Sequence, residues 1–277
     1  MTRRDTSTRV LCLVAGWVLV AIYLVPLLWM VSSSFKTNAE IFALPPTVIP
    51  TDVRWSNYGE VTTVIPFWRY FGNSVMVASL ATLGTLVSCS LVAYAFSRLP
   101  GRGVTPLFFV VLGTIMLPSV VTLVPQYLLF RELGWVGTYL PLIVPSWLGS
   151  GLSGAFSIFL LRQFFLTIPA DQVEAARIEG AGPLRTLVRV ILPQAKPALA
   201  VVAIFDFLAH WNDLITPLVY LTSPEQYTLP QGLAAFQGFY VTEWNLLMAG
   251  STLAILPVLV LTLAAQRVMD RGIVVNA

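Results

Sequence analysis

The chain has 277 residues, of which 57% are hydrophobic and only 10% are charged. A soluble domain of this size carries about 25% charged residues, so the composition excludes a soluble globular protein and indicates an integral membrane protein. The net charge of +3 is too small to favour nucleic acid as a partner. Both cysteines lie inside apolar runs, which offer neither a disulfide framework nor a metal site.

Six apolar segments are long enough to cross a bilayer, whose core of about 30 Å requires about 20 helical residues. They cover residues 11–30, 75–96, 104–130, 139–161, 198–221 and 246–265. The first segment follows three arginines, as a signal peptide would. Its apolar run is too long for a signal peptide, however, and no cleavage site follows, so we interpret it as a retained span. The sequence therefore predicts an all-α protein with six transmembrane helices.

The basic residues of the loops predict the orientation in the membrane. If the N-terminus lies in the cytoplasm, the outer loops contain only Lys36, Arg54, Arg69 and Arg131, and the other basic residues fall on the inner side. We therefore expect both termini to be cytoplasmic. The polar loop after the fourth span is then cytoplasmic as well.

That polar loop, residues 166–197, has proline and glycine residues at the positions expected for two helices joined by a glycine turn. A first helix is expected after Pro169, a cap at Gly180, and a second helix from Pro183. The second helix would carry an apolar stripe formed by Leu184, Leu187, Val188 and Ile191. Pro193 and Pro197 should end it before the fifth span. By this pattern alone, the pair could lie on the membrane surface as amphipathic helices.

The residue order of the loop is more specific than its hydrophobic pattern. It resembles the EAA loop of the permease subunits of ATP-binding cassette (ABC) importers at Glu174, Ala175, Ala176, Gly180, Val190, Leu192 and Pro193. The family usually has isoleucine where Val190 stands. Residues 73–75 (NSV) resemble the start of the family's conserved transmembrane domain. Three further segments are similar to the maltose-type carbohydrate branch of that family: residues 93–98 (AYAFSR), 159–165 (FLLRQFF) and 211–213 (WND).

The resemblance implies an ABC type I importer permease fold and a mechanism. In that family the EAA loop is a coupling helix seated in a cleft of a cytoplasmic ATPase, whose ATP-driven closure turns the permeases from inward-open to outward-open. The expected partners are a second, homologous permease, paired ATPase subunits, an extracytoplasmic solute-binding protein and membrane lipid, with a carbohydrate as cargo. The expected location is the bacterial cytoplasmic membrane, which the chain would cross several times.

The same resemblance implies that the chain has three parts. Residues 1–68 would form the N-terminal transmembrane helix and first extracytoplasmic loop, residues 69–267 the ABC type-1 transmembrane domain with the EAA loop, and residues 268–277 a short cytoplasmic tail. A phosphate-binding loop requires a Gly-Lys pair, and the sequence contains none. We therefore expect this chain to be no enzyme and to bind no cofactor, with ATP and Mg²⁺ held by the ATPase.

Polar residues inside a span are costly and usually face a cavity. The candidates for the translocation path or its gate are Asp206, His210, Trp211, Asn212 and Asp213 in the fifth span, and Gln126 and Tyr127 in the third. On a continuous helix, Asp206, His210 and Asp213 would share one face, and Trp211 could stack on a sugar ring. The alternative is a structural polar cluster that links neighbouring spans.

The outer loop at residues 222–245 has a counterpart in maltose-type permeases that reaches towards the binding protein. The resemblance implies a reaching tip formed by Gln231, Gly232, Gln237, Gly238 and Tyr240. The alternative is a plain polar connector.

Two rival functions remain open from the sequence. Residues 151–154 (GLSG) match the pattern of rhomboid-type intramembrane proteases, in which Ser153 would pair with His210, the single histidine of the chain. A self-sufficient secondary transporter is the second rival. Such a transporter would spread its coupling ionisable groups over several spans, whereas here they concentrate in the fifth.

Overall fold

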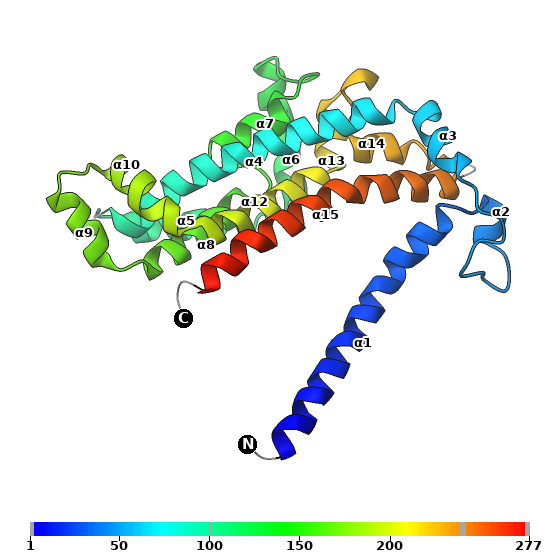
Figure 1. Ribbon diagram of the computed structural model, residues 1–277. Helices are drawn as coiled ribbons and strands as arrows, with labels where there is room; N and C mark the ends of the chain where they lie inside the picture. Colours follow the sequence, from blue (N-terminus) through cyan, green and yellow to red (C-terminus); the bar gives the residue numbers. More distant parts are fainter. Residues whose placement is uncertain (1–2, 100, 239–241, 275–277) are drawn as a thin grey trace. The chain divides into compact units, whose positions relative to one another are not determined.

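The computed structural model describes residues 3–99, 101–238 and 242–274 (Figure 1). Within these ranges the regular elements are all helices, and the one strand-like feature is an isolated bridge between Gln237 and Thr242. The chain divides into two compact units. The first comprises Met1–Phe67 with Gly232–Leu256, and the second comprises Trp68–Gln231 with Pro257–Ala277.

The first unit contains a long apolar helix and a short, tightly hydrogen-bonded polar segment. Its elements are α1 (Arg3–Ser33), α2 (Asn38–Ile41), α3 (Ser56–Val64), the end of α14 (Leu229–Ala234) and the first part of α15 (Trp244–Val274). Lys36 is fully buried, and its ammonium donates to the Thr47 carbonyl and lies 4.5 Å from the centroid of the Trp29 ring. The Asn57 amide donates to the Ser34 and Lys36 carbonyls at 2.8 and 2.9 Å, which fixes the turn after α1.

The second unit contains a long helix followed by shorter, broken ones. Its elements are α4 (Phe67–Arg98), α5 (Val104–Thr114), α6 (Ser119–Glu132), α7 (Leu140–Trp147), α8 (Gly154–Thr167), α9 (Ala170–Ile178), α10 (Pro183–Thr186), the π-helix η1 (Leu187–Ile191), α11 (Leu192–Gln194), α12 (Lys196–Trp211), α13 (Ile215–Tyr220) and the 3₁₀-helix η2 (Pro224–Gln226). The divide between the units falls within α15, at Pro257.

The all-helical fold is confirmed, and the spans differ in how continuous they are. Three helical stretches in the described residues are long and apolar enough to cross a membrane, namely Cys12–Ser33, Phe67–Arg98 and Trp244–Gln266. They correspond to the first, second and sixth predicted spans. The third predicted span is the bent pair α5 and α6, with an angle of 98° between them. Pro118, in an extended conformation immediately before α6, interrupts the helix.

The fourth and fifth predicted spans are not continuous helices. Residues 139–161 form α7 and α8, separated by a segment in which Gly149 and Gly151 have φ of +70° and +75°. Residues other than glycine rarely adopt this conformation, so the two glycines end the helix there. The fifth span, α12, ends at Trp211, and α13 begins only at Ile215.

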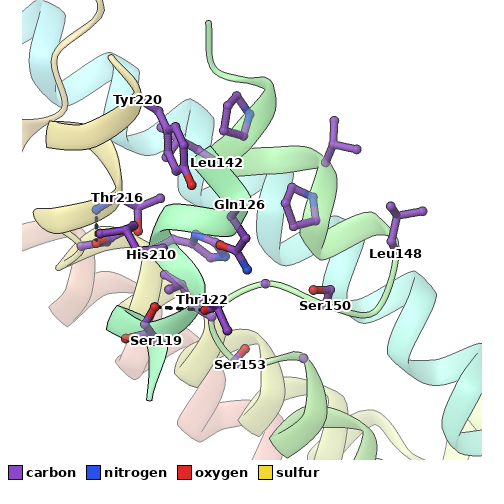
Figure 2. A pocket seen from close by; sticks show the side chains of 18 of the residues that line it. Ser119, Thr122, Gln126, Leu142, Leu148, Ser150, Ser153, His210, Thr216 and Tyr220 are labelled. Carbon is purple, nitrogen blue, oxygen red and sulfur yellow. Dashed lines mark hydrogen bonds between the residues drawn. The ribbon is translucent and has the colours of Figure 1, made fainter. Parts of the chain in front are cut away.

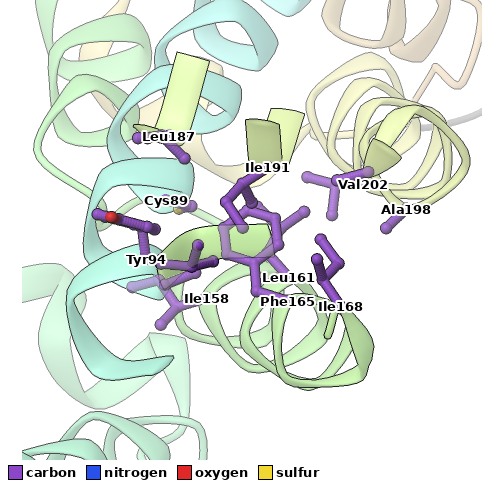
Figure 3. Close-up of a cluster of buried hydrophobic side chains, with 13 residues drawn as sticks. Cys89, Tyr94, Ile158, Leu161, Phe165, Ile168, Leu187, Ile191, Ala198 and Val202 are labelled. Atoms are coloured by element: carbon purple, nitrogen blue, oxygen red, sulfur yellow. The ribbon is translucent and has the colours of Figure 1, made fainter. Parts of the chain in front are cut away.

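The largest apolar cluster of the second unit joins α4, α8, the polar loop and α12. Figure 3 shows these side chains converging. The buried members are Cys89, Ala93, Tyr94, Ile158, Leu161, Phe165, Ile168, Val173, Leu187, Ile191, Ala195, Ala198 and Val202. The polar loop is therefore packed into the core of this unit and is not a loosely attached connector.

Candidate functional site

The loop that resembles the EAA motif folds as a helix, a glycine turn and a helix, as the sequence predicts. We name residues 170–194 the EAA hairpin. Gly180, with φ of +81°, follows α9, and the Gly180 amide donates to the Arg177 carbonyl at 2.9 Å. The Ala181 amide donates to the Ala176 carbonyl at 2.8 Å. This pair of hydrogen bonds is a Schellman cap, which satisfies the carbonyls at the helix end and requires a residue that tolerates positive φ.

The second half of the hairpin runs further than the sequence predicts. Pro183 begins α10, as expected, but Pro193 does not end the helix. A π-helical turn precedes Pro193, with the Leu192 amide donating to the Leu187 carbonyl. The wider turn accommodates a proline that has no N–H to donate. The chain bends instead at Ala195, where the hairpin and α12 meet at 84°.

One side of the hairpin is anchored in the core. Leu187 and Ile191 are buried, whereas Leu184 and Val188 are 63% and 53% exposed, so only half of the predicted apolar stripe packs inward. The Arg98 guanidinium at the end of α4 donates to the Phe165 and Ile168 carbonyls just before the hairpin. These contacts hold the hairpin as a rigid extension of α4 and α8.

The other side of the hairpin is open. Glu174 and Ala175 are exposed, and Ile178 is 88% exposed. The residues of the motif divide accordingly: Glu174, Ala175, Gly180 and Pro193 are exposed, and Ala176, Val190 and Leu192 are buried or half-buried. Of the two alanines of the motif, Ala175 alone is exposed, because Ala176 packs towards the core.

A buried polar network surrounds Asp206 on α12. Asp206 is fully buried, and its carboxylate accepts hydrogen bonds from the Thr85 hydroxyl at 3.1 Å and from the Ser153 hydroxyl. Nε2 of His210 lies 3.7 Å from Oδ2 of Asp206 and 3.3 Å from Oγ of Ser146. The network ties α12 to α4, to α7 and to the segment that breaks the fourth span. For Asp206, this geometry is that of a structural cluster.

The network does not form the serine–histidine dyad of a protease. The Ser153 hydroxyl donates to Asp206 and makes no hydrogen bond to His210 within the described chain. Ser146 and Asp206 both approach the same histidine nitrogen. A catalytic triad requires the serine and the carboxylate on opposite nitrogens of the ring.

A cavity of about 1100 Å³ lies in the second unit (Figure 2). Its walls come from α4, the bent α5–α6 pair, α7, the 148–153 segment, α8 and the α12–α13 junction. Of the predicted path residues, Gln126, His210 and Asp213 line it. Asp206, Trp211, Asn212 and Tyr127 do not line it.

Asp206 and His210 lie on one face of α12, as predicted, but Asp213 does not join them on that helix, which corrects the prediction for Asp213. Asp213 lies beyond the end of α12, where its carboxylate accepts from the Thr216 amide at 3.1 Å and caps the start of α13. Trp211 is buried, stacked on Phe207 at 5.6 Å and edge-on to Phe71 at 5.6 Å. Because Trp211 also does not line the cavity, its ring is not available to a sugar there.

The outer-loop candidates are split between buried and exposed positions. Gln231 and Gly232 are buried, while Gln237 and Gly238 are exposed. Tyr240 lies outside the described residues. A reaching tip on the described chain would therefore consist of Gln237 and Gly238.

The sequence reasoning missed several residues of this region. Thr85 and Ser146 complete the Asp206 network, and the Tyr220 and Thr228 side chains line the cavity. A usable signal was the high density of glycine and serine at residues 146–154, which indicates a broken helix. Single hydroxyls in apolar helices carry no comparable signal.

Several apolar helices, a cavity among bent helices and an exposed polar hairpin are the features expected of a membrane permease. The chain belongs to the family of binding-protein-dependent transport system inner membrane components, whose model matches residues 82–275. The resemblance drawn from the EAA residues and flanking spans is thereby confirmed. The protein is an inner membrane component of a transport system.

Relatives cover almost the whole chain. The trehalose/maltose transport system permease protein MalG of Thermococcus litoralis is 32% identical over 282 residues, covering 99% of this chain and 98% of the relative. The sn-glycerol-3-phosphate transport system permease protein UgpE of Escherichia coli is 32% identical and covers 92% of each chain. The solved structure of a bacterial ABC transporter involved in the import of the acidic polysaccharide alginate shares the fold, with a TM-score of 0.77, 24% identity and coverage of 96% and 98%.

Proposed function

We propose that this chain is one of two permease subunits of an ATP-driven importer for a carbohydrate. A solute-binding protein would deliver the cargo, consistent with the family's dependence on such proteins and with the carbohydrate systems among the relatives. The cavity of about 1100 Å³ would form this chain's half of the translocation path. Gln126, His210 and Asp213 are its lining residues among the predicted candidates.

The proposal rests on the EAA hairpin, which has one buried side and one exposed side. Its inner side is packed into the core through Leu187 and Ile191, and its outer side presents Glu174, Ala175 and Ile178. A soluble ATPase seated on the outer side would move the hairpin as a rigid body. The hairpin continues directly into α12 at Ala195, so its displacement would reach the Asp206 network and the cavity wall.

The remaining assignments follow from this arrangement. ATP and Mg²⁺ would be bound by the paired ATPase subunits, on the cytoplasmic side. Both termini of this chain would lie on the same side as the hairpin, in agreement with its basic loop residues. Gln237 and Gly238, which are exposed, would face the solute-binding protein on the opposite side.

The proposal predicts that uptake depends on a separate ATPase subunit. The purified assembly is reconstituted into proteoliposomes with its binding protein, and uptake of radiolabelled maltose and radiolabelled sn-glycerol 3-phosphate is measured. We expect uptake of at least one probe that requires both ATP and the ATPase subunit, because no phosphate-binding loop exists in this sequence. Uptake by the permeases alone would favour a secondary transporter and contradict the proposal.

A further inference from the structure

One end of the cavity is built from aromatic side chains. The Phe130 ring centroid lies 5.4 Å from that of Trp135 and 5.4 Å from that of Tyr220, and all three residues line the cavity. Tyr127 stacks on the Tyr220 ring at 6.2 Å, which helps to fix its position. Rigid aromatic surfaces provide apolar contact area, with a polar hydroxyl on tyrosine. The C–H faces of a sugar ring are suited to such a surface.

Three polar groups of the cavity wall have no hydrogen-bond partner in the described part of the chain. The Tyr220 and Thr228 hydroxyls are buried and have no hydrogen-bond partner in the described part of the chain. The Gln126 amide lines the cavity and is likewise without a hydrogen bond to any described residue. Figure 2 shows the hydroxyl end of Tyr220 directed towards the region where Gln126 and His210 lie. The two hydroxyls are buried, and unsatisfied buried groups are costly in a protein, whereas Gln126 is exposed. A ligand rich in hydroxyls would supply partners for all three groups.

The charge of the wall restricts the class of that ligand. Among the described residues that line the cavity there is no lysine or arginine, and Asp213 is the one carboxylate. Proteins bind phosphates and carboxylates through cationic side chains, above all arginine. This wall offers an anionic ligand no cationic partner and places the Asp213 carboxylate near it. A neutral polyhydroxyl ligand is not repelled by that carboxylate.

We propose that this chain contains a subsite for a neutral oligosaccharide, formed by Gln126, Tyr220 and Thr228 against the rings of Phe130 and Trp135. The subsite disfavours sugars that carry phosphate or carboxylate groups. This inference rests on the proposed carbohydrate import and narrows it. Of the solutes in the names of the relatives, trehalose and maltose have the chemistry that the wall accepts, and sn-glycerol 3-phosphate and alginate do not.

Equilibrium binding tests the subsite apart from the specificity of the binding protein. The assembly of this chain with its permease partner and ATPase is placed in nanodiscs without binding protein and titrated with tritiated maltotriose. We expect saturable binding that is weakened roughly two- to tenfold by Tyr220→Phe and by Gln126→Ala, since each removes one hydrogen bond. Matched controls are Tyr23→Phe in α1 and Gln163→Ala in α8, both at exposed positions, which should bind as the wild type does. Excess sn-glycerol 3-phosphate should not displace the sugar.

Three results would overturn the subsite: no saturable maltotriose binding, equal binding by wild type and both subsite variants, or displacement by sn-glycerol 3-phosphate as strong as by unlabelled maltotriose. Tyr220→Phe removes only an unpartnered hydroxyl, and Gln126 is exposed and unpaired in the described chain, so neither variant should fail to fold. ATP-dependent uptake is measured on the same preparations. If uptake requires the ATPase but one of these results is found, the proposed function stands and the subsite alone is wrong.

Discussion

Glu174→Lys is expected to abolish ATP-driven uptake while leaving the permease folded in the membrane. Glu174 lies on the exposed side of the EAA hairpin, and no intramolecular hydrogen bond to its side chain is found within the described chain. Its replacement therefore costs the fold little. In the proposed complex the carboxylate pairs with a cation of the ATPase, and reversing the charge converts attraction into repulsion at an interface. We expect uptake to fall at least tenfold in proteoliposomes, with less ATPase retained on the assembly.

The matched control is Glu132→Lys, at the end of α6. Glu132 is also exposed, so the same change of net charge is made away from the hairpin and should leave uptake unchanged. Glu174→Gln removes the charge without reversing it and should show an intermediate loss. Wild-type uptake by Glu174→Lys would show that the hairpin does not couple through this residue.

Asp206→Ala is expected to produce the largest loss of stability. The change removes a fully buried carboxylate that accepts from Thr85 and Ser153 and faces His210. Both hydroxyls lose this acceptor, and the histidine loses one of its two polar neighbours, the other being Ser146. Charge-assisted hydrogen bonds contribute about 1.5–3 kcal/mol each in soluble proteins and less on average in membranes, so we expect a loss of about 2–4 kcal/mol. Thermal unfolding in detergent measures it as a lower midpoint.

Two comparisons make the Asp206 result specific. Asp206→Asn keeps an acceptor for one hydroxyl and should lose less stability than Asp206→Ala. Asp213→Ala removes a half-buried carboxylate with one backbone hydrogen bond, and the loss of such a cap costs about 1 kcal/mol. If Asp206→Ala unfolds at the wild-type temperature, the network does not hold α12 to its neighbours.

The positions of the apolar helices could be predicted because hydrophobic length is set by the thickness of the bilayer. The hairpin was predictable because Gly180 and Pro183 act locally, through φ and through helix initiation. The continuity of the spans was not predictable in the same way. Pro125 remains inside α6, whereas Pro118 lies at a break, and which proline interrupts a helix depends on tertiary contacts.

Prediction of the candidate site from the sequence is limited in the same way. Helical spacing placed Asp206, His210 and Asp213 on one face, but α12 ends at Trp211, so the periodicity stops before Asp213. Trp211 looked suited to a sugar and is instead packed against Phe71 and Phe207. The cavity-lining roles of Tyr220 and Thr228 depend on which helices meet, and that information lies in long-range packing.

The most direct test of the central claim is site-specific photocrosslinking from the outer side of the EAA hairpin. A benzophenone maleimide is attached through Ala175→Cys in a Cys12→Ser background, because Cys12 is exposed and Cys89 is buried. Glu132→Cys provides the matched exposed site away from the hairpin. We predict an adduct between this chain and the co-purifying ATPase from Ala175→Cys and none from Glu132→Cys. An intact assembly that gives no ATPase adduct from Ala175→Cys would contradict docking through the hairpin.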